Sequence, residues 1–447
     1  MRIIVTTLIL IIISATSFAQ QQLTLNDAIQ IALHKNSTLQ KNMNNLETFE
    51  SGVQSAWGNF LPTLSAGANW NWNRSDVEGI ITQTVGGVPV LSVSTESRDY
   101  NAGFSSGWTL FDGLSNFATL SQNENNLESA RLSLDRLKQD IVFQTMFLYY
   151  DIINALKLLE VKQDNLKWNE KNLETIRERN KLGAATLADV YQQEVAKGNA
   201  ELEIITTRNR MESAENDLLY YLGLDVLDEY EFSYVLTDQE QKILNTDFTL
   251  DFENITELVN QALVQRRDYN SAKLNLESSM DGITIAQSGH WPSLSAFGSV
   301  TWLGSKLSEL DNSRRFSAGL SLNFPIFLGW SVSNRVQFAE VDAKNSEIEL
   351  NDLERNIKRE LRSTFLDIQA ALKGLNVSEN NVAAANENLK IEEEKYSLGA
   401  GKLLDVLIAN SQYTTALTDL INAQFAYIVL SEQLKYNLGV LDFTMYE

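Results

Sequence analysis

The sequence contains no cysteine, so it can form no disulfide and offers no thiolate to a metal or a lipid. Its two histidines, His34 and His290, do not stand beside carboxylates at the spacing of metal ligands. No glycine loop of the GxxxxGK[ST] kind occurs, and Ser-Gly pairs such as Ser106-Gly107 lack the strand–turn–helix setting of a hydrolase nucleophile. We therefore expect no enzyme, no cofactor and no metal site.

Apolar runs long enough to cross a bilayer are also lacking. The longest, Ile3–Ile13, follows Arg2 and precedes the small residues Ser17 and Ala19. This order predicts a secretory signal peptide over residues 1–19 with cleavage after Ala19. An uncleaved membrane anchor is the alternative, and the run is too short to favour it.

Basic residues are scarce relative to acidic ones. The chain has 36 lysines and arginines against 58 aspartates and glutamates, a formal net charge of −22. Such a surface repels phosphates, so we expect neither nucleic acid nor an anionic lipid surface as a partner.

Proline is scarce, and its positions leave two long segments, Ser115–Leu182 and Ser331–Leu398, without one. Each would form a helix about 100 Å long at 1.5 Å per residue. Leucine and isoleucine recur every seven residues in both segments, which predicts left-handed coiled-coil packing. The four prolines are Pro62, Pro89, Pro292 and Pro325.

What the chain does have is an internal repeat. Pro62-x-Leu64-Ser65-Ala66 matches Pro292-x-Leu294-Ser295-Ala296 at an offset of 230, whereas Phe111-x-Gly113 matches Phe327-x-Gly329 at 216. The first copy therefore carries 14 extra residues between Ala66 and Ala102. They belong to the polar segment Arg74–Arg98, which we predict to be an extracellular loop whose stretch Ile80–Thr95 extends a hairpin around Gly86-Gly87.

Each copy also contains two segments in which apolar and small polar residues alternate. In Leu64–Trp72 the apolar positions are the even ones, and Tyr100–Leu110 follows the same rule. A period of two predicts strands with one apolar and one polar face. A soluble sandwich would alternate in the same way; the strand length near ten residues and the aromatic residues towards strand ends favour a membrane barrel.

Each long helix is expected to end at a glycine, Gly183 in the first copy and Gly399 in the second. A glycine supplies the positive φ that ends a helix, so each tip predicts an αα-hairpin. Thr186 and Asp189 form a capping-box pattern at the first tip. At the second tip Lys402 replaces the threonine, and Asp405 keeps the acidic half alone.

The two-fold repeat, the Pro-x-Leu-Ser-Ala corners and the paired Leu-Gly-Ala…Asp-Val tips resemble the TolC-like outer-membrane efflux proteins, over roughly residues 22–440. The resemblance implies a homotrimer whose strands, four from each chain, form one barrel in outer-membrane lipid. It implies a helical tunnel across the periplasm, closed at its tips until a periplasmic adaptor protein and an inner-membrane RND or ABC transporter dock.

In that family a tyrosine precedes the second tip glycine and aspartates follow it. Tyr396 and Asp405 occupy the matching positions, whereas Ile408 and Gly401 stand where the family has an acidic and a basic residue. The family's tip-closing ion pairs are therefore not carried over in detail. The residues expected at the periplasmic gate and adaptor tip are Gly183, Asp189, Tyr396, Gly399 and Asp405.

The expected fold is mainly α with a membrane β part: an internally duplicated, trimeric α-barrel/β-barrel with four strands and long coiled-coil helix hairpins per chain. The expected function is the exit channel of a tripartite efflux or type I secretion system; a structural or adhesive surface protein with a coiled-coil stalk is the alternative. The expected divisions are a first repeat over 20–224 (strands 63–73 and 99–111, tip 182–186), a connector over 225–251, and a second repeat over 252–447 (strands 293–303 and 315–326, tip 398–402).

Overall fold

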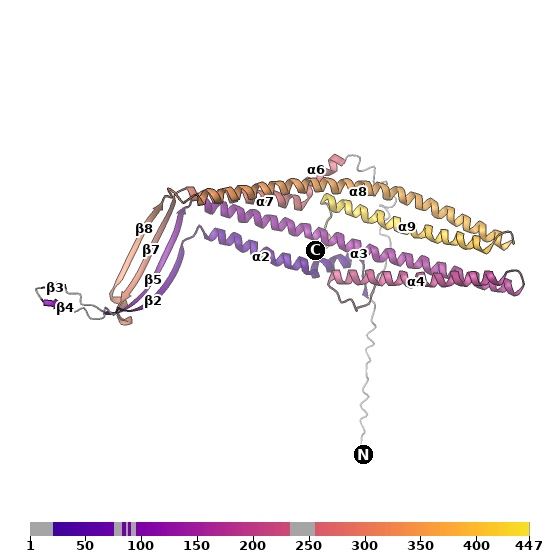
Figure 1. Ribbon diagram of the computed structural model, residues 1–447, viewed down its shortest axis with the longest axis horizontal. Coiled ribbons are helices and arrows are strands. Elements are labelled where there is room, and N and C mark those ends of the chain that lie inside the picture. The colour runs from indigo at the N-terminus through magenta and orange to yellow at the C-terminus, as the bar shows by residue number, and fades with distance from the viewer. Residues whose placement is uncertain (1–20, 76–82, 86–87, 91–94, 233–254, 447) are drawn as a thin grey trace, which may run out of the picture. The chain divides into compact units, whose positions relative to one another are not determined.

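A computed structural model describes residues 21–75, 83–85, 88–90, 95–232 and 255–446 of the chain (Figure 1). The predicted signal peptide over residues 1–19 and most of the predicted connector over 225–251 lie outside the described residues, as does the Gly86-Gly87 turn.

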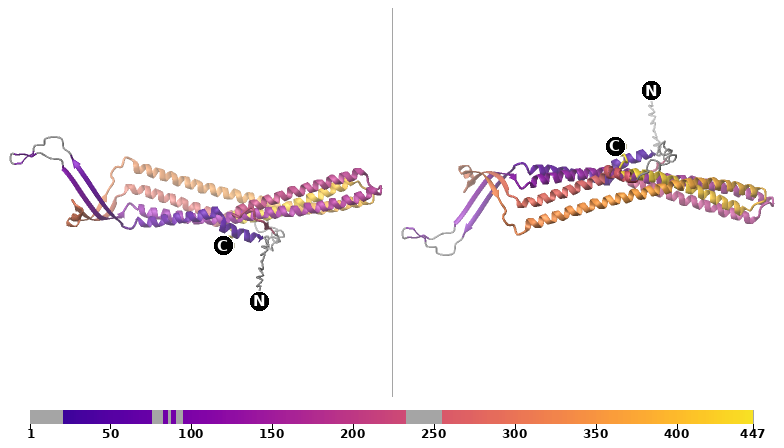
Figure 2. Two further views of the ribbon diagram at one scale, coloured as in Figure 1. Left: turned by 90° about the horizontal axis from the view of Figure 1, so that it is seen from below. Right: turned by 90° about the horizontal axis from the view of Figure 1, so that it is seen from above.

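Four long helices dominate the chain, and they fall into two matched pairs (Figures 1 and 2). Helices α3 (Ser115–Lys181) and α8 (Ser331–Ser397) each have 67 residues, and α4 (Leu187–Leu222) and α9 (Leu403–Leu438) each have 36. Because both pairs are related by the offset of 216 found in the sequence, the duplication extends to the length of each helix. The absence of proline lets the backbone hydrogen-bond ladders run unbroken.

Shorter helices precede each pair of strands in the chain. They are α1 (Leu25–Lys35) and α2 (Ser37–Gly58) in the first repeat, and α6 (Ile255–Gln265) and α7 (Arg267–Gln287) in the second. The joints between them, Asn36 and Arg266, are equivalent positions at offset 230. Among the residues that the structure describes, none of the helices combines the length and the apolar character needed to cross a bilayer.

One antiparallel sheet joins the two repeats, with the strand order β2-β5-β7-β8. Strand β2 covers Thr63–Ser75, β5 Thr95–Phe111, β7 Ser293–Gly304 and β8 Arg314–Asn323. The last strand was expected to reach residue 326, but it ends at Asn323. Proline has no N–H to donate and restricts the residue before it, so Pro325 does not continue the ladder.

The register places like side chains opposite one another, as the alternation predicts. On one face Trp70 lies opposite Tyr100 with ring centroids 6.3 Å apart, and Phe104 lies opposite Val300. On the other face Ser65 lies opposite Ser105, and their hydroxyls are 2.8 Å apart. The sheet therefore has an apolar face and a face of small polar groups.

Two short pairs of strands lie outside this sheet. Strands β3 (Gln83–Val85) and β4 (Val88–Val90) pair antiparallel within the long loop of the first repeat. Strands β1 (Gln21–Gln22) and β6 (Tyr230–Glu231) pair in parallel.

The chain divides into two compact units, and neither corresponds to one sequence repeat. Unit 1 comprises residues 1–43, 134–267 and 354–447, and unit 2 comprises residues 44–133 and 268–353. Each unit therefore contains parts of both repeats. The ranges 20–224 and 252–447 mark copies of one pattern, not two independent domains.

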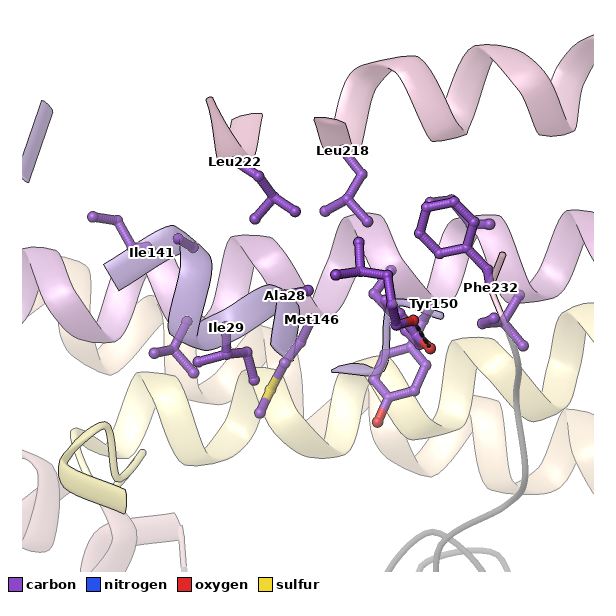
Figure 3. Packing of buried hydrophobic residues seen from close by; sticks show 14 of the residues in the cluster. Ala28, Ile29, Ile141, Met146, Tyr150, Leu218, Leu222 and Phe232 are labelled. Carbon is purple, nitrogen blue, oxygen red and sulfur yellow. Dashed lines mark hydrogen bonds between the residues drawn. The ribbon is translucent and has the colours of Figure 1, made fainter. Parts of the chain in front are cut away.

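The main core of unit 1 is built from α1, α3, α4 and α9 (Figure 3). Ile29 of α1 and Ile141 of α3 are fully buried there, and Leu218 and Leu222 of α4 close over them. The Tyr149 hydroxyl donates to the Leu23 carbonyl at 3.2 Å, so this buried phenol is satisfied.

Candidate functional site: the helix-hairpin tips

The first tip is a five-residue turn between α3 and α4. Gly183 has φ of 75°, and the Ala184 amide donates to the Arg179 carbonyl at 2.8 Å. Apart from Gly183 and its two chain neighbours, no described residue has a heavy atom within 4 Å of the position that a Cβ on Gly183 would take. The left-handed backbone, not a lack of space, is therefore what requires glycine here.

Helix α4 begins with the predicted capping box, which the structure confirms. The Asp189 carboxylate accepts from the Thr186 amide at 2.9 Å and from the Thr186 hydroxyl at 2.7 Å. In return the Asp189 amide donates to the Thr186 hydroxyl oxygen at 3.1 Å. The Asp189 carboxylate thus satisfies the Thr186 amide and places its negative charge at the positive end of the helix.

The second tip repeats the backbone of the first but not its cap. Gly399 has φ of 73°, and the Ala400 amide donates to the Lys395 carbonyl at 2.9 Å. Lys402, at the N-cap of α9, makes no side-chain cap hydrogen bond. The side chain of Asp405 is exposed in the first turn of α9. Its charge therefore takes no part in a capping box.

Tyr396 packs between the two hairpins. It contacts one apolar cluster containing Ile176 and Val190 and a second containing Leu389 and Val406. Burial raises the pKa of its phenol above the ordinary range, the Asp189 carboxylate adds to the rise, and the Arg179 guanidinium partly opposes it. One residue expected at the gate, Asp189, therefore acts electrostatically on another, Tyr396.

Arg179, which the sequence did not single out, joins the tips of the two hairpins. Its guanidinium donates to the Tyr396 carbonyl at 3.3 Å and to the Ser397 carbonyl at 3.5 Å, and lies 5.2 Å from the Tyr396 ring. The last carbonyls of a helix have no partner within it and carry partial negative charge. A cation from α3 thus binds the end of α8. The sequence did contain a feature that could have indicated this contact: each of the two long helices has a basic residue in its last turn, Arg179 in α3 and Lys395 in α8.

Polar side chains connect the hairpins further from the tips. The Trp168 indole N–H donates to Glu393 at 2.8 Å, and the Asn410 amide donates to the Asn165 side-chain oxygen at 2.8 Å. Within the first hairpin, the fully buried Gln193 donates to the Asn169 side-chain oxygen at 2.9 Å. Buried amide pairs of this kind fix the register of neighbouring helices.

The structure brings Asp189 and Tyr396 together and leaves Asp405 separate and exposed. In the part of the chain that the structure describes, no group of three or more histidine, cysteine or acidic side chains could hold a metal ion. The tips offer helix-end carbonyls, an aspartate that takes part in a capping box, an aspartate that does not, and a partly buried phenol. These groups suit the holding or release of helices and the passage of ions.

The sequence was compared with protein families and with known proteins, and both comparisons found matches over most of the chain. A sequence model of the outer membrane efflux protein family matches residues 28–224 and 258–440. The chain is 23% identical to the outer membrane protein TolC of Escherichia coli K12, over 96% of this chain and 85% of TolC. It is 23% identical to the proteases secretion protein PrtF of Dickeya chrysanthemi, over 97% of this chain and 92% of PrtF.

The solved structures show the same fold. The crystal structure of the outer membrane protein VceC from Vibrio cholerae superposes with a TM-score of 0.77 and 18% sequence identity. The match covers 93% of this chain and 96% of VceC.

Proposed function

The chain belongs to the outer membrane efflux protein family, and we propose that three copies form the exit duct through which an inner-membrane pump, joined by a periplasmic adaptor protein, expels its cargo. Its relatives include the secretion protein PrtF as well as TolC, so either efflux or type I secretion fits the family. The pump partner is then of the RND or the ABC class.

The four-stranded sheet is the observation that carries this proposal. Its apolar face is exposed: Leu64 is 77% exposed and Leu320 69%. Strands β2 and β8 are its edges, with unpaired backbone groups on their outer sides. Four strands are too few to close a barrel, which needs about eight. Edges supplied by further copies would complete the ladder, and lipid would cover the apolar face.

The polar face of the same sheet supports a water-filled interior. Successive strands place Ser105 opposite Ser299, and Ser299 opposite Ser317, in one row across the sheet. Serine and glycine leave space in a barrel lumen and tolerate water. The wide lumen of a three-chain barrel suits an exit duct better than a packed stalk.

The gate is proposed at the hairpin tips, from Gly183, Asp189, Tyr396, Gly399 and Asp405. The contacts of Arg179 with the end of α8 support it, because they link hairpins that must move apart if the tips open. Three exposed Asp405 carboxylates near the axis of a trimer would favour cations over anions in the pore.

Two measurements test the proposal. The detergent-purified protein should have the mass of three chains together, and it should conduct ions when inserted in a planar bilayer. A stable folded monomer would contradict the shared barrel. A trimer without conductance would indicate an adhesive stalk instead of a duct.

A further inference from the structure

A tryptophan lies opposite an arginine in both hairpins of the four-stranded sheet. Trp72 of β2 is the register partner of Arg98 of β5, and Trp302 of β7 is the partner of Arg314 of β8. Trp302 is the equivalent of Trp72 at offset 230, and Arg314 is the equivalent of Arg98 at offset 216. The two copies therefore have the same pair of side chains at the same place, although the segments that join them differ in length by 14 residues.

Both pairs lie on the apolar face of the sheet. The Trp72 indole N–H donates to Glu96 at 2.8 Å, and the Arg98 guanidinium donates to the same carboxylate at 2.8 Å. The Arg314 guanidinium lies 5.1 Å from the centre of the exposed Phe316 ring. Both arginines are exposed. On the face that lipid is proposed to cover, each hairpin thus has an exposed arginine beside aromatic rings.

The pairs lie at the end of the sheet where the strands of each hairpin are joined. Arg314 is the first residue of β8, and Arg98 is the fourth residue of β5. The segment that contains β3 and β4 connects β2 to β5 at this end (Figure 1). If that segment is extracellular, as we predict, both pairs are at the level of the outer leaflet of the membrane.

The local charge at these pairs differs in sign from the net charge of the chain. On strands β2, β5, β7 and β8, the charged residues in phase with the apolar face are Arg74, Glu96, Arg98 and Arg314. They are three cations and one anion. Charges in salt solution act over about 10 Å, so the acidic helices elsewhere do not cancel this excess. The net charge of −22 argues against phosphate ligands for the chain as a whole, but not for this part of it.

The two side chains of a pair suit the two parts of a phosphorylated lipid. A guanidinium has five N–H donors in a planar fork that fits phosphate oxygens. Arg98 uses its Nε and one Nη on Glu96, so further N–H groups are left for another acceptor. Tryptophan prefers the boundary between lipid and water, where its ring lies against acyl chains. A free anion would gain from the arginine alone, whereas a lipid gains from both residues.

From this repeated arrangement we propose that each pair, Trp72 with Arg98 and Trp302 with Arg314, binds the phosphate of a lipid headgroup in the outer leaflet. The ligand is a glycolipid that carries phosphate monoesters, because a monoester has more negative charge than the diester of a common phospholipid. Three copies would present six such pairs around the barrel. The inference rests on the proposed function, since it requires the apolar face of the sheet to lie in the membrane.

The test is native mass spectrometry of the trimer-sized protein in a nonionic detergent, titrated with diphosphoryl lipid A. The parent protein should bind this lipid more tightly than phosphatidylcholine, and the binding should weaken as salt is raised. An excess of inorganic phosphate should leave the lipid bound, because a free anion gains nothing from the apolar face. Displacement by inorganic phosphate would assign the arginines to a soluble anion and overturn the inference.

Charge variants on the two faces of one strand give a matched control. Arg314→Gln should lower the affinity for diphosphoryl lipid A severalfold. Arg315→Gln removes the same charge from the next residue, which lies opposite Thr301 on the polar face, and should keep the parent affinity. A loss in Arg315→Gln equal to that in Arg314→Gln would show attraction by overall charge, without a site.

Variants of the first hairpin should change the affinity in opposite directions. Arg98→Gln should lower it severalfold, and combining this change with Arg314→Gln should lower it further. Glu96→Gln keeps the size of the side chain and removes the anion that competes for Arg98, so it should raise the affinity.

A conducting trimer whose Arg98→Gln, Arg314→Gln double variant binds diphosphoryl lipid A as the parent does would overturn the inference and leave the duct intact. The absence of trimer and of conductance in the parent protein would overturn the proposed function together with the inference.

Discussion

Replacing Asp189 by alanine should loosen the first hairpin tip, and the structure sets the size of the effect. The Asp189 carboxylate accepts two hydrogen bonds, from the amide and the hydroxyl of Thr186, at 2.9 and 2.7 Å. The N-cap residue Thr186 keeps its hydrogen bond from the backbone amide of residue 189, so only the carboxylate at the helix N-terminus is lost, which costs about 0.3–1 kcal/mol. Local opening at the start of α4 should therefore become roughly 2- to 5-fold more frequent. The pKa of Tyr396 should fall as well, because Asp189 helps to raise it.

The matched variant is Asp405→Ala at the second tip. Asp405 occupies the equivalent position in α9, but Lys402 provides no side-chain cap, so little stability should be lost. If three Asp405 carboxylates line the pore, their removal should lower cation selectivity. We therefore expect Asp189→Ala to change the stability of its tip, and Asp405→Ala to change the ion selectivity of the channel.

Hydrogen exchange measured on peptides covering residues 183–195 and 399–411 gives the local stability of each tip. Reversal potentials in a salt gradient across a planar bilayer give the selectivity. Equal protection of residues 183–195 in Asp189→Ala and the parent protein would refute the capping argument. Unchanged selectivity in Asp405→Ala would leave that aspartate as an ordinary residue at the start of a helix.

Three further predictions concern the core, the pH range and the topology. Glu360→Ala removes the carboxylate that lies 2.9 Å from Arg266, whose side chain is 4% exposed, and should lower the free energy of unfolding by about 3–5 kcal/mol. The control variant Glu354→Ala breaks a more exposed ion pair with Lys358 and should lower it by less than about 1 kcal/mol. Thermal melts of the two variants compare these losses. Burial is the main cause that raises the pKa of Tyr436 to about 12. The neutral phenol therefore contributes its full stabilisation below about pH 10, and this stabilisation is lost as the pH rises through about 12. In thermal melts at alkaline pH, Tyr436→Phe should lose less stability over this range than the parent protein. A tag inserted at Gly87 should be labelled on intact cells, and labelling confined to broken cells would invert the proposed topology.

Local features of the fold could be predicted from the sequence because they depend on neighbouring residues. The capping box needs only Thr186 and Asp189, three positions apart. The two-residue alternation correctly gave the apolar and polar faces of the sheet, and the glycines at 183 and 399 have the positive φ expected of them. In each case the deciding interaction spans a few residues of chain.

Features that depend on which helix meets which could not be predicted in this way. Arg179 binds carbonyls more than two hundred residues away, and nothing near it in the chain specifies the end of α8 as its partner. The compact units mix both repeats because strands β5 and β7, one from each copy, pair with each other. The end of β8 at Asn323, by contrast, could have been predicted from the sequence, because Pro325 cannot donate a backbone hydrogen bond and so ends the strand before residue 326.

The two copies have diverged in a way that the order of assembly explains. Helices α4 and α9 have equal length, yet seven residues of α4 are buried against fourteen of α9. Helix α9 meets α3 within one chain, so the stacked rings of Phe143 and Tyr436 are partly covered before any second copy is present. A face that must wait for a second copy remains in water until then, and an apolar face left exposed invites aggregation.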